Sequence, residues 1–285
     1  AVNCIRRAAD GSLTGYNTDI VGLRAALDEE ETSRIESEDD QTLIVVDVPV
    51  AEKQDEEKTI VYSTMPMAII SNNNFITTVC LRENAVITEI SQGLVKNIQT
   101  HMRTHFLLSI LLRIATRFLQ YLKQIDKISY TTENLLHKTM RNKELVQILG
   151  LEKSLVYFST SLKSNEVTLE KILRGRLIKL YDEDEELLED VIIEVKQAIE
   201  MCSIYSNVLS NTMDAFASII SNNLNIVMKV LTALTIVMAL PNVIFGMYGM
   251  NVEGMPMPYF WFAMLLAGLL MLVCMVILWK KDMFH

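Results

Sequence analysis

The chain has 285 residues, half of them hydrophobic, and a formal net charge of −9. This length accommodates one soluble domain plus a short membrane segment, and the acidic balance argues against nucleic acid and anionic lipid surfaces as partners while favouring cations. The four cysteines are scattered without CxxC spacing, which predicts reduced thiols and no disulfide framework.

Residues 1–27 contain a turn signal, Asp10-Gly11, and the stretch Gly15-Tyr16-Asn17-Thr18-Asp19 before an expected helix. The segment resembles an internal piece of shikimate dehydrogenase, in which the residues matching Asn3 and Asp19 contact shikimate. The lysine that this family uses in catalysis is expected further upstream, and no Gly-rich dinucleotide loop follows. We therefore expect an orphan fragment of a natural or spurious fusion, without enzymatic activity and without an organic cofactor.

Three strand-like stretches follow an acidic, polar segment over residues 28–40. The first two are rich in Val and Ile and are separated by a charged turn, and the third follows Ser71-Asn72-Asn73-Asn74, a tight-turn signal. These features predict a small, mainly antiparallel sheet. The expected strands are Thr42–Val50, Thr59–Ile70 and Phe75–Leu81.

Helical periodicity begins near Asn84. Glu89–Ile128 is expected to form one or two amphipathic helices, and the next helix is expected to start at Ser129–Glu133 and to reach about Leu162. Ser164-Asn165-Glu166 is then expected to be a turn before a helix over Val167–Leu180, so that the last two helices pack as a hairpin.

Two histidines in the first helical region, His101 and His105, lie four residues apart. This spacing can hold Zn²⁺ on one helix face, but the sequence offers no third ligand nearby. A solvated helix face is therefore the preferred interpretation.

Seven acids fall within the ten residues Tyr181–Asp190 and open the most regular helical pattern in the chain. Apolar positions then recur at alternating spacings of three and four through Ile219, a heptad seam that favours helix packing, expected between subunits. No proline lies between Leu187 and Pro241. One helix is therefore expected from about residue 187 into the membrane, on the order of 90 Å at 1.5 Å per residue.

Two apolar stretches, residues 226–247 and 259–279, are each long enough to cross a bilayer. The second is uncharged throughout, which argues against the alternative of a buried core helix. The connector 251–258 has no Lys or Arg, whereas Lys280 and Lys281 follow the second stretch. The positive-inside rule then predicts both termini in the cytosol and the connector outside.

Tyr248-Gly249-Met250-Asn251 at the end of the first span, a short acidic loop and a second span ending in Lys-Lys resemble the CorA family of magnesium channels. The resemblance extends over about residues 28–285. It implies a homopentamer in the cell membrane, surrounded by lipid, with a cytosolic funnel, a long pore helix, hydrated divalent cations as substrates and regulatory metal sites between subunits. The family has further residues before the position of Asp28, so the funnel is expected to lack its first strand or helix.

The predicted fold class is an α+β cytosolic funnel domain, with a small mainly antiparallel sheet plus helices, joined by a very long stalk helix to a two-helix transmembrane hairpin. The expected divisions are the orphan fragment 1–27, the funnel domain 28–186, the stalk and first span 187–250 with its membrane part at 226–247, the extracytoplasmic loop 251–258, the second span 259–279 and a basic cytosolic tail 280–285.

A filter for Mg²⁺ is expected at the end of the first span. Mg²⁺ gives up its waters reluctantly, so a pore recognises it best through hydrogen bonds to those waters. Five copies of Asn251 would supply a ring of amide oxygens, and Gly249, followed by Met250, would let the backbone approach closely and turn. A helix C-cap is the alternative role of Asn251. Five copies of Glu253 are expected to concentrate cations at the outer mouth.

One stripe of the first span, here called the pore stripe, is predicted to line the pore. Its polar members would solvate the ion, and Met228 and Leu231 would form a hydrophobic gate that closes by dewetting. Contact with lipid or with another helix is the alternative for its apolar members. The pore stripe comprises Asn225, Met228, Leu231, Thr235, Ala239, Asn242 and Gly246.

Acids in the stalk are expected to hold regulatory Mg²⁺. The resemblance implies acidic residues at Asp190 and Asp214, with Asp190 as a ligand between subunits and Glu89 as a guess for its partner. Bound Mg²⁺ would neutralise the acids and hold the funnel closed until cytosolic Mg²⁺ falls. The expected function is uptake of Mg²⁺, with Co²⁺ or Ni²⁺ as further passengers. The alternatives are a zinc transporter of the same superfamily, a non-conducting fusion product and an enzyme of shikimate metabolism.

Overall fold

The chain forms two compact units, unit 1 over Ala1–Thr212 and unit 2 over Met213–His285. A computed structural model describes residues 4–7, 13–16, 31–38, 41–54, 59–72, 75–95, 100–139, 142–175, 178–250, 257 and 259–281.

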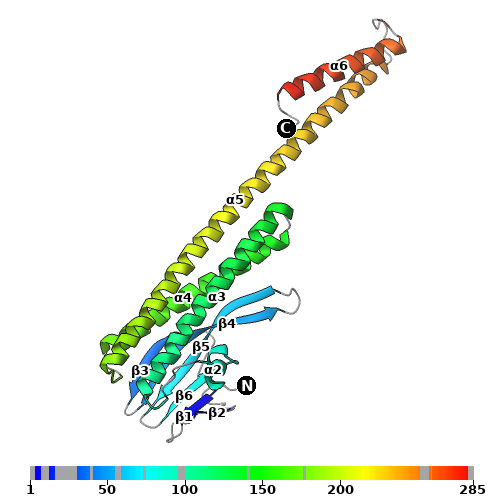
Figure 1. Ribbon diagram of the computed structural model, residues 1–285. Helices are drawn as coiled ribbons and strands as arrows, with labels where there is room; N and C mark the ends of the chain where they lie inside the picture. Colours follow the sequence, from blue (N-terminus) through cyan, green and yellow to red (C-terminus); the bar gives the residue numbers. More distant parts are fainter. Residues whose placement is uncertain are drawn as a thin grey trace. The chain divides into compact units, whose positions relative to one another are not determined.

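A four-stranded antiparallel sheet in the order β3-β4-β5-β6 is the first layer of unit 1 (Figure 1). The three predicted strands are confirmed, and the turn before β6 is held by Asn72, whose side-chain oxygen accepts from the backbone N–H of Phe75 at 2.8 Å. The edge strand β3 was not predicted, because its residues are mostly polar and lack the apolar alternation of a half-buried strand. The strands are β3 Arg34–Glu38, β4 Gln41–Gln54, β5 Thr59–Ser71 and β6 Ile76–Cys80.

A separate antiparallel pair, β1 (Cys4–Arg7) and β2 (Leu13–Tyr16), lies with β1 against β6 (Figure 1). The two strands flank the expected turn at Asp10-Gly11. That turn, Asn3 and Asp19 lie outside the described residues.

Helices form the second layer of unit 1, and α3 and α4 pack on each other and on β4. Consecutive residues of β4 (Ile44–Val46) and β5 (Met67–Ile69) are apolar and buried, so both faces of the sheet are covered. One of these faces packs against apolar residues of α3 and α4. An aromatic cluster marks the contact, in which Tyr62 of β5 lies 5.5 Å from Tyr121 and 6.3 Å from Phe158 between ring centroids. The helices of unit 1 are α2 Ala85–Ser91, α3 Arg103–Thr139 and α4 Asn142–Gly175. Helix α5, Asp182–Tyr248, begins in unit 1 and continues into unit 2, which also contains α6, Phe260–Lys280.

Two expected helix boundaries are wrong. Ser129–Glu133 lies inside α3, where the hydroxyls of Thr131 and Thr132 both donate to the Ile128 carbonyl instead of capping a new helix. Ser164–Glu166 lies inside α4, because Asn165 is buried there and bonds to the sheet. Its side chain accepts from the N–H of Asp47 and donates to the C=O of Asp47, each at 2.8 Å. Tertiary hydrogen bonds therefore override the local turn preference of these polar residues.

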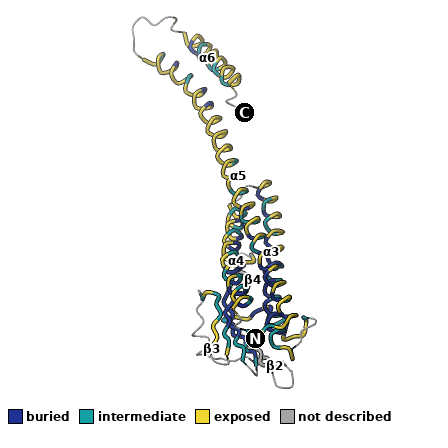
Figure 2. Tube along the Cα trace, turned by 90° about the vertical axis from the view of Figure 1, so that its left-hand side faces the viewer, coloured by how far each residue is buried: buried dark blue, intermediate teal, exposed yellow. Residues whose placement is uncertain are grey.

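Unit 2 is a helical hairpin with an apolar exterior. The spans in α5 and α6 are long and apolar enough to cross a membrane, and 11% of each apolar window is buried. A core helix of a soluble protein would be mostly buried, so this alternative is excluded for both (Figure 2). The buried residues are mainly small ones, which let two helices approach closely. They are Ala233, Val237 and Ile244 of α5 and Ala263 and Ala267 of α6.

Candidate ion pathway

The predicted filter begins where α5 ends. The last helical residue is Tyr248, and the N–H of Gly249 still donates to the Phe245 carbonyl at 2.9 Å. A Cβ at Gly249 would lie 3.2 Å from that carbonyl oxygen, which is tighter than most real contacts. A Cβ at Gly249 would therefore crowd the last turn of its own helix, and Gly249 is not among the described residues with positive φ. Met250 follows with its side chain exposed. Asn251 and Glu253 lie outside the described residues.

All seven members of the pore stripe lie on the continuous helix α5 and are exposed in the single chain. At 3.6 residues per turn, their mean direction is roughly 180° around the helix from Ala233, Val237 and Ile244, the buried residues. The pore stripe therefore lies on the face of α5 opposite the buried residues of this span.

Hydroxyl groups along this part of α5 are hydrogen-bonded within the helix. The Thr235 hydroxyl donates to the Leu231 carbonyl at 2.8 Å, and the Thr232 hydroxyl donates to the Met228 carbonyl at 2.7 Å. A hydroxyl whose proton is already used presents its oxygen as an acceptor. Thr235 on the pore stripe can therefore accept a hydrogen bond from a water molecule of a hydrated cation.

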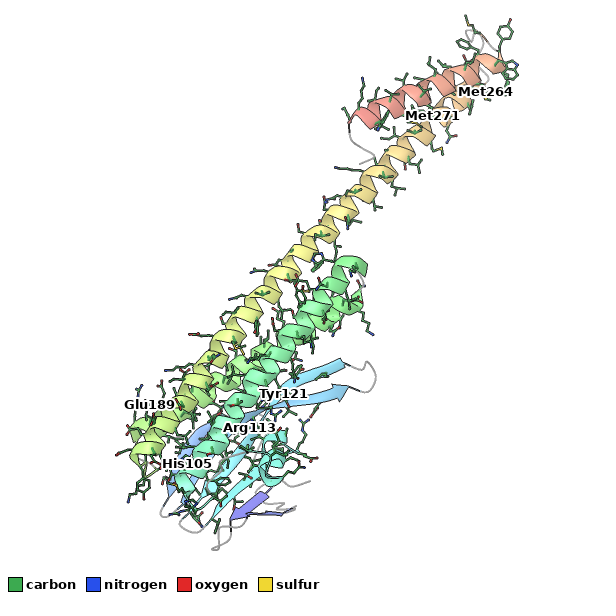
Figure 3. All side chains as sticks on the ribbon, viewed as in Figure 1. His105, Arg113, Tyr121, Glu189, Met264 and Met271 are labelled. Carbon is green, nitrogen blue, oxygen red and sulfur yellow. The ribbon has the colours of Figure 1, made fainter. Side chains whose placement is uncertain are left out.

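The three acids predicted to bind regulatory metal have different surroundings. Asp190 and Asp214 are exposed on α5. Glu89 of α2 is half-buried and paired with two arginines of α3, Arg113 at 2.6 Å and Arg117. Figure 3 labels Arg113 on α3. A regulatory cation would therefore meet free carboxylates at the two aspartates but would have to displace two guanidinium groups at Glu89.

The pairing also determines the ionisation of Glu89. Burial raises the pKa of this carboxyl, but the hydrogen bonds and charges of Arg117 and Arg113 outweigh burial, so its pKa lies below the ordinary value of 4.5.

The histidine pair does not share a helix face, because His101 precedes α3 and His105 lies inside it. His105 is partly buried, and its Nδ1 lies 3.7 Å from a carboxylate oxygen of Asp184, so the expected solvated face is wrong for this residue. Asp184 also accepts from the N–H of Tyr181 at 3.3 Å, as a capping residue of α5 does. Among the described residues, no three His, Cys, Asp or Glu side chains form a metal-binding group.

Comparison with known proteins identifies the family. The sequence matches the CorA-like Mg²⁺ transporter protein family over residues 7–281, so the match includes most of the segment 1–27. The resemblance of that segment to shikimate dehydrogenase stays a prediction.

Two curated relatives are cobalt/magnesium transport proteins. The CorA protein of Methanocaldococcus jannaschii is 29% identical over 262 residues, which cover 88% of this chain and 80% of the relative. The CorA protein of Thermotoga maritima is 34% identical over 116 residues, 37% of this chain and 33% of the relative.

A solved structure has the same fold. The complete CorA magnesium transporter from Methanocaldococcus jannaschii superposes with a TM-score of 0.78 at 24% identity, covering 99% of this chain and 97% of that chain. This likeness confirms the predicted fold class of a sheet-and-helix domain, a very long helix and a C-terminal apolar hairpin. Because the family match extends over nearly the whole sequence, the chain belongs to the CorA-like Mg²⁺ transporter family of membrane transport proteins.

Proposed function

We propose that the chain is one subunit of a homopentameric channel for Mg²⁺ in the cell membrane, with Co²⁺ as a further passenger. The observation that carries the proposal is the pore stripe: five of its seven members are polar or small, and all seven follow one face of α5 through the apolar span, opposite the buried residues of that span. Polar groups in a membrane helix face a cavity or another helix. Five such faces around an axis would enclose a polar pathway.

The filter lies at the outer end of this pathway in our proposal. Five copies of Asn251 accept hydrogen bonds from the waters of hydrated Mg²⁺, which avoids the cost of stripping them. Gly249 supports this role because its missing Cβ allows the backbone to pass close to the Phe245 carbonyl. Glu253 attracts cations to the mouth, and both chain ends are cytosolic by the charge asymmetry of the hairpin.

The gate lies deeper, at Met228 and Leu231, whose side chains are exposed on α5 in the single chain. Rings of five such apolar side chains exclude water when the helices approach one another. Cytosolic Mg²⁺ bound between subunits at Asp190 and Asp214 offsets the repulsion among acids and holds the helices together. Loss of Mg²⁺ from these sites opens the pore. Glu89 is the least favourable of the proposed ligands because Arg113 and Arg117 already neutralise it.

Growth of a host that lacks Mg²⁺ uptake tests the transport function. The wild-type chain is expected to restore growth at low Mg²⁺, and Asn251→Ala is expected to abolish the rescue at equal membrane expression. Rescue by the Asn251→Ala variant would refute the filter assignment. Failure of the wild-type chain would favour a non-conducting protein.

Limited proteolysis tests the regulatory role. Mg²⁺ is expected to protect the purified wild-type protein from cleavage, and Asp190→Ala should reduce that protection. Glu200→Ala is the matched control, since it removes an exposed acid from the same helix. Unchanged protection in Asp190→Ala would eliminate Asp190 as a regulatory ligand.

A further inference from the structure

A groove lies between α4 and α5 within unit 1 and has no part in the proposed ion pathway. Its volume is about 330 Å³, within the range that holds small ligands. It lies above a buried seam in which Leu155 of α4 and Cys202 of α5 are both covered. The lining residues are Leu155, Val156, Ser159, Thr160 and Lys163 of α4 and Ile199, Cys202, Ser203, Ser206 and Asn207 of α5.

The rim of the groove consists of hydrogen-bonding groups from both helices. Ser159, Thr160 and Lys163 contribute from α4, and three residues of α5 face them, Ser203, Ser206 and Asn207. The Thr160 hydroxyl is used internally, since it donates to the Val156 carbonyl at 3.0 Å. No carboxylate lines the groove. The remaining hydroxyl, amide and ammonium groups can all donate hydrogen bonds into the same space.

Lys163 gives this space a positive charge. Lys163 forms no ion pair among the described residues. The carboxylate oxygens of two acids on α4, Glu166 and Glu170, instead lie 3.6 and 3.5 Å from the Nζ of Lys196 on α5. The ammonium group lies close enough to Cys202 to influence its thiol. An ammonium group beside neutral donors, without a carboxylate, favours an anionic ligand with several acceptor oxygens.

The buried Cys202 thiol argues against a metal site or a nucleophile in the groove. Burial raises the pKa of Cys202 to about 12, and the nearby Lys163 charge opposes this increase only partly. The thiolate is the form of cysteine that binds metals and attacks electrophiles. At neutral pH the Cys202 side chain is therefore a protonated, apolar floor, so the chemistry of the groove depends on its rim.

We propose that the groove binds a small oxyanion of the phosphate class, held by Lys163 from α4 and by Ser203, Ser206 and Asn207 from α5. The tetrahedral anion would present acceptor oxygens to both helices at once. Binding would add hydrogen bonds between α4 and α5 beside the ion pairs that Lys196 of α5 forms with Glu166 and Glu170 of α4. Occupancy would therefore stabilise the packing of α5 on α4.

Thermal unfolding of the detergent-solubilised full chain tests this site, with inorganic phosphate titrated against chloride at constant ionic strength. The wild-type protein is expected to show a saturable rise in its unfolding temperature. Lys163→Met should weaken phosphate binding about tenfold or more, since it removes a charge-assisted bond. Lys153→Met is the matched control, because Lys153 lies over the Tyr157 ring on α4 and does not line the groove.

Two results would overturn the proposal. One is a wild-type protein whose unfolding temperature does not respond to phosphate in a saturable way. The other is an equal response in Lys163→Met and Lys153→Met. Ser206→Val gives a second route if Lys163→Met fails to fold, since it removes the hydroxyl donor from the α5 side of the groove. If Lys163→Met does not fold, Ser206→Val decides the question. A rise in unfolding temperature with phosphate that is the same in Ser206→Val as in the wild type would then contradict the site.

Discussion

At the scale of single residues, Gly249 is the described position where the predicted filter and the structure meet. Gly249→Ala forces a Cβ to within 3.2 Å of the Phe245 carbonyl oxygen, so the end of α5 must shift. We expect roughly tenfold slower Mg²⁺ uptake into liposomes, equivalent to about 1.4 kcal/mol. Gly268→Ala on α6 is the control, because nothing lies within 4 Å of its added Cβ. Equal uptake by both variants would show that close approach at Gly249 is not required.

Glu89 offers a prediction about pH. Because the arginines lower its folded-state pKa below 4.5, its contribution to stability is present above pH 4.5 and is lost as the pH falls through the lowered value. Glu89→Gln should therefore destabilise the full chain by about 1–2 kcal/mol at pH 7 and lose less stability than the wild type below pH 4.5. Chemical unfolding followed by circular dichroism measures both effects.

The matched control for this change is Glu83→Gln, an exposed residue just before α2. It should alter stability by no more than about 0.5 kcal/mol. Parallel acid profiles for Glu89→Gln and the wild type would mean that the Arg113 and Arg117 contacts do not hold the carboxylate in its charged form.

At the scale of elements, the packing of α4 on the sheet depends on Asn165, a polar residue that its local sequence wrongly assigns to a turn. Asn165 satisfies both backbone groups of Asp47 in β4 and accepts a hydrogen bond from the Ser33 hydroxyl at 2.8 Å. Asn165→Ala leaves the N–H and C=O of Asp47 without this partner, so we expect a loss of about 2–4 kcal/mol in the free energy of unfolding. Asn134→Ala on the exposed part of α3 should be nearly neutral.

Asn165 also shows which features of the fold the sequence does not predict. The strands β4, β5 and β6 and the spans in α5 and α6 could be predicted because their apolar patterns are determined by local periodicity. The continuity of α4 through Asn165 could not, since its partner Asp47 lies 118 residues away in the sequence. Strand β3 was missed for a related reason: its polar residues are held in the sheet by pairing with β4, not by their own preference.

In the candidate site, too, features set by local spacing could be predicted and contacts between separate elements could not. The position of the seven pore-stripe residues on one face of α5 was predictable, because it follows from helical spacing alone. Their role in lining a pore stays a prediction. The arginine pair that neutralises Glu89 and the contact between His105 and Asp184 were not, since both join separate elements. The groove of the oxyanion proposal also requires the packing of α4 against α5. The heptad seam was expected to pack between subunits, but this is wrong for its residues Leu188, Val195 and Cys202, which are buried within the single chain.

At the scale of the whole molecule, the proposed function divides the exposed residues of α5 in the membrane span between a pore and lipid, and chemical labelling can test this division. Thr235 belongs to the pore stripe, whereas Leu234, also exposed in the single chain, is turned about 100° away. In a variant without the four native cysteines, Thr235→Cys should react with a charged, water-soluble thiol reagent and block Mg²⁺ uptake. Leu234→Cys should react far more slowly. Equal reactivity would contradict the assignment of this face to the pore.

In the proposed function, copies of this chain alone form a Mg²⁺ pathway with Asn251 at its mouth. Purified protein in liposomes, with Mg²⁺ entry followed by an internal fluorescent indicator, tests it most directly. We predict rapid Mg²⁺ entry for the wild-type chain and near-background entry for Asn251→Ala, with both proteins the same size by light scattering. Absence of entry with the wild-type chain, or undiminished entry with Asn251→Ala, would contradict the account.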